Sequence, residues 1–296
     1  MSRAKLSVGL LFLAVAACGG GNKIANTAQG IAAGPQPVDF LPGGSSIVMG
    51  IDFEKGLKAK IAQSHLDKLR AETPKSVADL KAQCGIDLFG GDVKNVTVGM
   101  EDPNKQETVF LVSDNKFEQK TFDECIAKMG ATVAQRGKLV DYKQAKREYV
   151  GYWPNSTTSV FSFDGKADFT GVMNGGLNQE MLGLKAKTKT DSIFWVMGKI
   201  PPEAAGNIPG ARHFRLSIDG DDTVTFSAAV VFDTQENAST SKAKLDQQMG
   251  LSSMVLGEAA KNIVVGQSGN DVTIDATFTE AEIENIIKTV MTMAGK

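Results

Sequence analysis

Histidine, cysteine and clustered acids supply most catalytic and metal-binding side chains. This chain of 296 residues has only two histidines and three cysteines. A Ser-His-Asp triad or a histidine metal site would need His65 or His213, its two histidines. His65 falls in a charged amphipathic segment and His213 begins an apolar segment, so we expect both to be ordinary structural residues. The sequence contains no HExxH, CxxC or GxxxxGK pattern. We therefore predict that the protein is not an enzyme. We also predict that it has no catalytic residue, no metal ligand and no cofactor.

The one acidic cluster is Asp219-Gly220-Asp221-Asp222, between two segments of alternating apolar residues. Calcium takes six to eight oxygen ligands, and an EF-hand loop spreads them over 12 residues that end in glutamate. The spacing here fails after Asp222, so we predict a solvated hairpin turn, with a weak surface calcium site as the alternative. Gly266-Gln267-Ser268-Gly269 is one residue short of the GxSxG nucleophile pattern and is better explained as a turn.

The N-terminus carries the strongest functional pattern. Arg3 and Lys5 precede the apolar run Leu6–Ala17, which is too short to span a bilayer and is typical of a signal peptide. The run ends in a cysteine, Cys18, preceded by three small residues: Val15, Ala16 and Ala17. This arrangement resembles the lipobox of bacterial lipoproteins. The resemblance implies a signal peptide over 1–17, cleavage after Ala17, and a diacylglycerol and further acylation at Cys18. The alternative is an ordinary signal peptide with an incidental cysteine.

The same resemblance bears on location. Two or three acyl chains suffice for stable membrane attachment, because each buried CH₂ contributes roughly 0.8 kcal/mol. Gly19 follows the cysteine, where aspartate tends to retain Gram-negative lipoproteins in the inner membrane. The resemblance therefore implies a lipid-anchored protein of the bacterial envelope, in the outer membrane if the source is Gram-negative. The Gly-, Ala- and Pro-rich stretch 18–38 is expected to be the lipidated cysteine and a flexible tether.

The two remaining cysteines, Cys84 and Cys125, form an even pair in an exported chain. A bridge between them would close a loop of about 41 residues and stabilise the fold by on the order of 4 kcal/mol. We predict a structural disulfide, and two separate buried thiols are the alternative.

The elements that must position these residues alternate between strand-like and helical patterns. Single strands are expected at 46–53, 168–175 and 192–200. Hairpins are expected at 93–114, 147–164, 213–232 and 262–278, and a charged connector precedes residue 147. Helices are expected at 57–69, 77–84, 116–129, 238–261 with a break at Gly250, and from Thr279, where Glu282 completes a capping box. Short hairpins favour antiparallel sheets over a parallel sheet. The prediction is an α+β fold with helices packed on one face.

The chain divides into two halves with a similar order of elements, 39–185 and 186–296. Val48-Met49-Gly50 in the first expected strand of one half recurs as Val196-Met197-Gly198 in the first strand of the other. We interpret this as a degenerate duplication, and chance sharing of three common residues is the alternative. The strand start at Asp39–Phe53, the segment "CGIDL" and the paired halves resemble uncharacterised lipoproteins of large Gram-negative genomes. That resemblance implies no particular activity.

Composition limits the partners. The net charge is −2 without a basic block, and aromatics are 7%, so nucleic acid is an improbable partner. Aromatic residues cluster only at Tyr149, Tyr152 and Trp153, which lie near Trp195 in the expected fold. We expect these side chains to pack in the core or at a sheet edge, and the alternative is that they line a pocket or a partner surface. The hypothesis is a non-enzymatic binding or assembly module, anchored to the membrane by its acylated N-terminus, with an envelope protein or lipid as partner. The alternative is a carrier that holds a lipid or other apolar ligand between the sheet and its helices.

Overall fold

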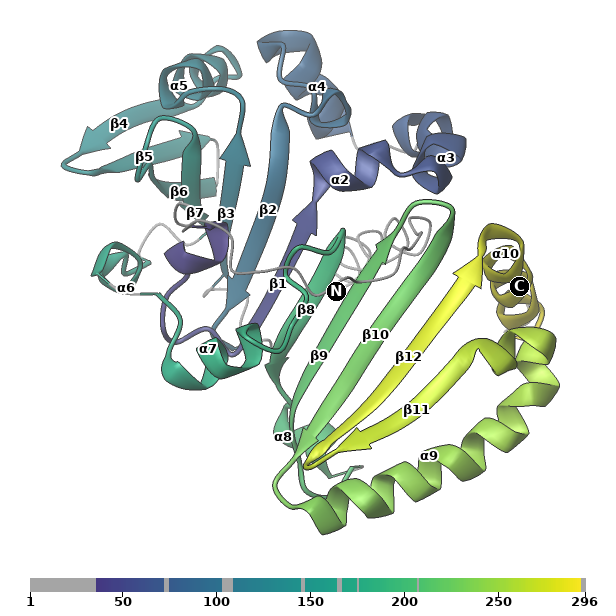
Figure 1. The fold of residues 1–296 in the computed structure, drawn as a ribbon. Coiled ribbons are helices and arrows are strands. Elements are labelled where there is room, and N and C mark those ends of the chain that lie inside the picture. The colour runs from purple at the N-terminus through teal and green to yellow at the C-terminus, as the bar shows by residue number, and fades with distance from the viewer. Residues whose placement is uncertain are drawn as a thin grey trace, which may run out of the picture. The chain divides into compact units, whose positions relative to one another are not determined.

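The computed structural model describes residues 36–71, 75–102, 109–144, 147–163, 167–174, 176–206 and 208–293. These residues form two compact units. The first unit holds residues 36–57 and 66–187, and the second holds 58–65 and 188–293. In each unit antiparallel strands are combined with helices (Figure 1), so the predicted α+β class is confirmed.

The strands of the first unit lie in the order β1-β2-β3-β7-β6-β5-β4, and each neighbouring pair is antiparallel. Their bounds are β1 Ile47–Asp52, β2 Val93–Met100, β3 Val109–Asn115, β4 Thr132–Arg136, β5 Leu139–Gln144, β6 Arg147–Tyr152 and β7 Thr158–Ser162. The helical elements around them are η1 Pro37–Phe40, α2 Phe53–Lys58, α3 Lys60–Ala71, α4 Lys75–Cys84, η2 Leu88–Gly90, α5 Gln119–Lys128, α6 Thr170–Asn174 and α7 Gln179–Lys185. Residues 58–65, at the junction of α2 and α3, belong to the second unit.

At β3 and β7 both faces of the first unit's sheet are covered, which corrects the expectation of helices on one face. Phe161 of β7 packs under Phe122 of α5, with ring centroids 5.2 Å apart. The neighbouring residue Ser162 points to the opposite face from Phe161 and pairs with Phe110 of β3. On that opposite face the ring of Phe110 lies 5.4 Å from the ring of Phe169, which directly precedes α6. The strands are apolar on both faces, so each face needs its own cover.

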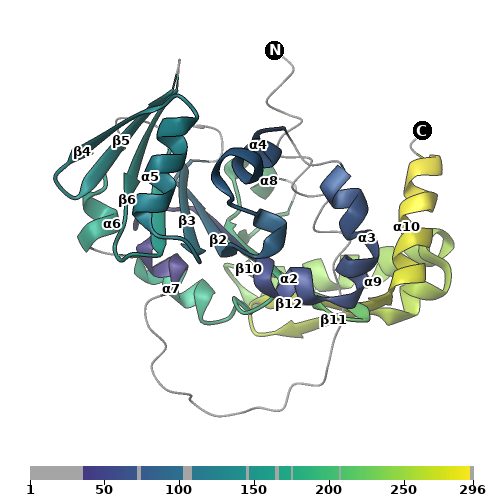
Figure 2. The ribbon, with the colours of Figure 1, turned by 90° about the horizontal axis from the view of Figure 1, so that it is seen from above.

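The second unit orders its strands β8-β9-β10-β12-β11, again antiparallel throughout. Their bounds are β8 Phe194–Lys199, β9 Ala211–Gly220, β10 Thr223–Phe232, β11 Ile263–Ser268 and β12 Asp271–Thr279, accompanied by α8 Pro202–Ala205, α9 Gln235–Leu256, η4 Gly257–Asn262 and α10 Glu280–Met293. Ala238 and Leu245 of α9 pack on Phe232 and Val272, which are buried on one face of this sheet. Figure 2 shows α9 and α10 beside β11 and β12.

Local sequence explains most element boundaries. Gly85 and Gly130 follow α4 and α5 in the left-handed conformation, with φ of 71° and 86°. At the start of α10 the capping box is confirmed, because Glu282 Oε2 accepts the Thr279 N–H at 2.7 Å and Thr279 Oγ1 accepts the Glu282 N–H at 3.3 Å. The tether prediction is corrected at its end: η1 begins at Pro37 and Val38 is buried, so folded structure precedes Asp39.

Three element predictions were wrong. The charged connector before residue 147 forms the hairpin β4–β5, closed by Gly137 at φ 64°. The segment 168–175 contains α6 rather than a strand, because the Asp168 carboxylate caps the Thr170 N–H at 2.8 Å. Helix α9 continues through Gly250 and ends before Gly257, whose φ is 56°. An internal glycine costs a helix only about 1 kcal/mol relative to alanine, too little to force a break.

Candidate functional site

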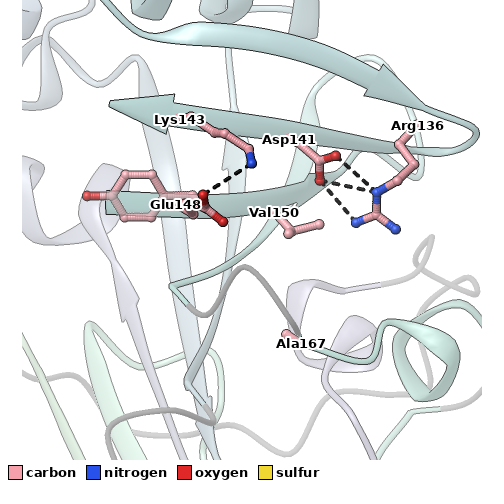
Figure 3. A pocket seen from close by; sticks show the side chains of 7 residues that line it. Arg136, Asp141, Lys143, Glu148, Val150 and Ala167 are labelled. Carbon is pink, nitrogen blue, oxygen red and sulfur yellow. Dashed lines mark hydrogen bonds and ion pairs between the residues drawn. The ribbon is translucent and has the colours of Figure 1, made fainter. Parts of the chain in front are cut away.

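An open pocket of about 260 Å³ lies on one face of β4, β5 and β6 in the first unit (Figure 3). Two oppositely charged pairs dominate it, above a small apolar base. Its lining residues are Arg136, Asp141, Lys143, Glu148, Tyr149, Val150 and Ala167.

Strand alternation places the charged side chains here. On β5, Asp141 and Lys143 point to one face while Val140 and Tyr142 point to the other. Tyr142 lies under α5, where its ring is 5.7 Å from that of Phe122. Because the apolar and aromatic residues occupy the face covered by α5, the charged residues of the same strand are left on the open face.

The first pair in the pocket is a two-pronged ion pair across the β4–β5 hairpin. Arg136 Nε donates to Asp141 Oδ2 at 3.0 Å, and its Nη2 donates to Oδ1 at 3.0 Å. This hydrogen bonding raises the pKa of the Arg136 guanidinium and lowers the pKa of the Asp141 carboxyl. Lys143 and Glu148 form the second pair, from β5 to β6, with Nζ and Oε1 3.1 Å apart.

The chemistry of this site favours recognition over proton transfer. Asp141 is a weak base because its pKa is held low, and the seven lining residues include no serine, cysteine or histidine. A polar or ionic ligand could bind here by exchanging with one of the ion pairs. On the opposite face, burial and the hydrogen bond to Asp123 raise the pKa of Tyr142, which therefore stays protonated.

The predicted anchor residues lie outside the described residues. These are the lipidated Cys18, the recognition residues Val15, Ala16 and Ala17, and the sorting residue Gly19, together with the proposed signal peptide 1–17 and most of the tether. The helices of the described ranges include none with the length and apolarity to cross a membrane.

The predicted disulfide is confirmed. Cys84 at the end of α4 and Cys125 in α5 are bonded, with Cα atoms 5.1 Å apart. Cys125 is 2% exposed, and the Met129 sulfur lies 3.8 Å from that of Cys84. The alternative of two separate thiols is wrong.

The acidic cluster forms the β9–β10 turn and holds the start of α3. Asp221 Oδ1 accepts the Lys60 N–H at 3.0 Å, and Lys60 Nζ lies 2.7 Å from Asp222 Oδ1. The hydrogen bond to Asp222 contributes most to a raised pKa of Lys60, and the Lys60 N–H lowers the pKa of Asp221. The hairpin turn is confirmed, and these acids hold a helix start. Within the described ranges no group of three His, Cys, Asp or Glu side chains could hold a metal.

The remaining singled-out residues fall within ordinary elements. His65 lies in α3, its side chain outside the described set, and His213 is the third residue of β9. Gly266–Gly269 forms the end of β11 and its turn, with Gly269 at φ 57°, as predicted.

The predicted packing is confirmed for Tyr149 and Trp153, although Tyr149 also lines the pocket. Trp153 packs on Phe122, with ring centroids 5.9 Å apart, and Tyr149 on Phe163 at 5.7 Å. Tyr152 pairs with Leu139 across β5 and β6, and Trp195 is buried on β8 of the second unit.

Sequence reasoning missed the charged pocket because it missed β4 and β5. The usable pattern was Gly137-Lys138, a two-residue hairpin turn in which the glycine adopts positive φ, followed by alternation of Val140 and Tyr142 with charged residues. High charge obscured it, since one face of this hairpin is open to solvent.

Fold and site together define an α+β protein of two antiparallel units with a charged surface pocket. The chain is similar in structure to TP0453, a membrane protein of Treponema pallidum. With crystal form III the TM-score is 0.55 at 9% identity, over 86% of this chain and 98% of that chain. Form I gives 0.51 at 11%, over 86% and 97%, and form IV gives 0.53 at 10%, over 85% and 96%. At such identities the likeness concerns the fold alone. No protein-family model and no curated protein matches the chain.

Proposed function

We propose that this protein is a membrane-anchored envelope lipoprotein that acts as a non-enzymatic binding or assembly module. One observation carries the proposal: Arg3 and Lys5, the apolar run Leu6–Ala17 and Cys18 stand in the order of a lipoprotein signal peptide. The charged pocket supports a binding role, because its two oppositely charged pairs offer ionic recognition to a polar ligand.

The anchor would work by concentrating the folded units near the membrane. A flexible segment of about 20 residues has a mean reach of roughly 25 Å, which confines the units to a thin layer. Confinement raises the effective concentration of a binding surface for envelope partners without any new contact. The outer membrane is the proposed location in a Gram-negative source, because Gly19 is not aspartate.

The experiment is metabolic labelling with a radiolabelled fatty acid, followed by crosslinking in the native envelope. Cys18→Ala should abolish the label, release the protein from the membrane fraction and reduce the captured partners. The matched control is Cys84→Ala with Cys125→Ala, which removes both other cysteines and should keep the label. Label that persists in Cys18→Ala, or capture of partners that does not depend on the anchor, would contradict the proposal.

A second candidate, a carrier of an apolar ligand, is favoured by one face of the second unit's sheet. Leu216, Ala228, Ile274 and Val265 form a cross-strand row on it, and each is only half-buried. This is the face on which α9 packs, where Val265 contacts the cluster of Phe232 and Val272. Native mass spectrometry of the purified protein tests this function, since a carrier retains a lipid of defined mass.

We also infer that the two units arose by degenerate duplication. Val48-Met49-Gly50 lies in β1 and Val196-Met197-Gly198 in β8, the first strand of each unit. In both units helical structure, a hairpin and a further helix follow the first strand, and the last strand pairs with the third, as in β7 with β3 and β12 with β10. The first unit ends in four strands, β4 to β7, where the second has the two strands β11 and β12. An alignment of homologues in which the two units match each other would support the inference, and independent unit families would overturn it.

A further inference from the structure

Strand β4 forms one end of the first unit's sheet. Its described pairing is with β5 alone, from Thr132 opposite Lys143 to Arg136 opposite Leu139. In Figures 1 and 2 it is the outermost strand of its unit. Its side chains are exposed except that of Val133, which is half-buried. One long edge of the strand therefore faces away from the sheet.

The backbone groups on that edge follow from the hairpin. In a two-residue hairpin the closing pair is hydrogen-bonded, and hydrogen-bonded pairs then alternate along the strands. The closing pair here is Arg136–Leu139, so the N–H and C=O groups of Val133 and Gln135 point outward. Within the described ranges neither residue has a backbone hydrogen-bond partner on that side. A row of such groups is a template for another strand.

Few of the usual features that block edge pairing are present. The strand has no proline, and its register with β5 is regular from end to end. Helix α5 packs on one face of the hairpin, through Phe122 and Tyr142. Two features of β4 still disfavour pairing with another strand: the strand is short, and the charged Arg136 lies at one end.

The charge around the edge selects its partner. Residues 125–140 contain three cations, Lys128, Arg136 and Lys138, and no acid. The acids that flank this segment already have partners: Asp123 accepts from the Tyr142 hydroxyl, Glu124 lies 3.9 Å from Lys120 Nζ, and Asp141 is paired with Arg136. A strand laid along β4 would meet the cations first, so an acidic segment is favoured. A second copy of this chain would instead bring two sets of cations together.

We propose that the β4 edge binds an extended acidic segment of a partner protein by strand addition. The Val133 and Gln135 backbone groups supply the hydrogen bonds, while Lys128, Arg136 and Lys138 select for acidic side chains. This inference rests on the proposed binding function and names the site and the partner chemistry.

The test measures binding of a fluorescent eight-residue peptide, Glu alternating with Thr and Val, to the detergent-solubilised mature protein by anisotropy. The same peptide with Lys in place of Glu is the charge control. Gln135→Pro removes the outward N–H and keeps the inward ladder, so it should weaken acidic-peptide binding by about tenfold, as expected for one or two lost hydrogen bonds. Gln135→Thr keeps the N–H and should bind like the unmodified chain.

A second variant keeps the proposal falsifiable if Gln135→Pro fails to fold. Lys128→Glu with Lys138→Glu leaves the Arg136–Asp141 pair intact and should reverse the preference toward the basic peptide. Equal binding of both peptides, or unchanged binding by Gln135→Pro, overturns the proposal. Dimerisation of the chain that Gln135→Pro abolishes would assign the edge to a second copy and also overturn it. None of these results alters labelling at Cys18, so the two proposals fail separately.

Discussion

At the scale of single residues, the paired charges of the pocket show how the fold tunes its ionisable groups. Asp141 is 24% exposed and held by two hydrogen bonds from Arg136, whereas Glu148 and Lys143 are each 58% exposed. Exposed pairs are screened by water and contribute little to stability, so the two pairs should differ measurably.

Asp141→Asn should therefore destabilise the protein at neutral pH more than Glu148→Gln does. The loss for Asp141 should be roughly 1 kcal/mol after allowance for solvent screening. Because folding lowers the pKa of Asp141, its contribution is present above the unfolded pKa of about 3.9 and lost as pH falls through the lower folded value. Urea unfolding at pH 7 and pH 2.5 checks this prediction. A difference between Asp141→Asn and the unmodified chain that persists at the acidic pH would contradict it.

The acidic turn offers a second contrast between neighbouring residues. Asp221 accepts the N–H of Lys60 at the start of α3, whereas Asp222 contacts only the Lys60 ammonium among the contacts described here. Asp221→Ala should lower the Tm more than Asp222→Ala, because it removes a helix cap in addition to an exposed ion pair. Differential scanning calorimetry compares the two, and equal Tm values would show that the cap is unimportant.

At the scale of elements, the disulfide joins α4 to α5 across a sequence separation of 41 residues. Replacing Cys84 and Cys125 together by serine should reduce the free energy of unfolding by on the order of 4 kcal/mol, because the unfolded chain gains the freedom of an open loop. Denaturant unfolding with and without a reductant measures the effect. The reductant should destabilise the unmodified chain and leave the double variant unchanged; an effect on the double variant would point to another cause.

Elements with strong local patterns could be predicted from sequence, and those set by tertiary contacts could not. The alternation of Phe214, Leu216 and Ile218 correctly indicates β9, and Thr279 with Glu282 correctly indicates the start of α10. The β4–β5 hairpin was missed because its open face is charged. The cover on both faces of the first unit was missed because single-strand patterns do not show which helix returns to which face.

The candidate site divides in the same way. The count of cysteines paired Cys84 with Cys125, because only these two remained once Cys18 was assigned to lipidation. The pairing of Arg136 with Asp141 depends on the register of a hairpin, and the contact of Lys60 with Asp221 joins residues 161 positions apart. Contacts of this range follow from the packing of whole elements, which no short motif records.

At the scale of the whole molecule, the chain forms two antiparallel α+β units, and we propose that the N-terminus holds them at a membrane. The fold likeness to TP0453 spans 86% of this chain and concerns architecture alone. The proposed anchor therefore depends on residues 3–19 of the sequence, and the proposed partner surface on β4.

The most direct test of the anchor is mass spectrometry of the N-terminal peptide from protein extracted from its native membrane. We predict a mature chain that begins at Cys18 and carries a diacylglyceryl group on the cysteine sulfur, with or without an acyl group on the new amine. A mature chain that begins at any other residue, or a Cys18 with a free thiol, would contradict the account.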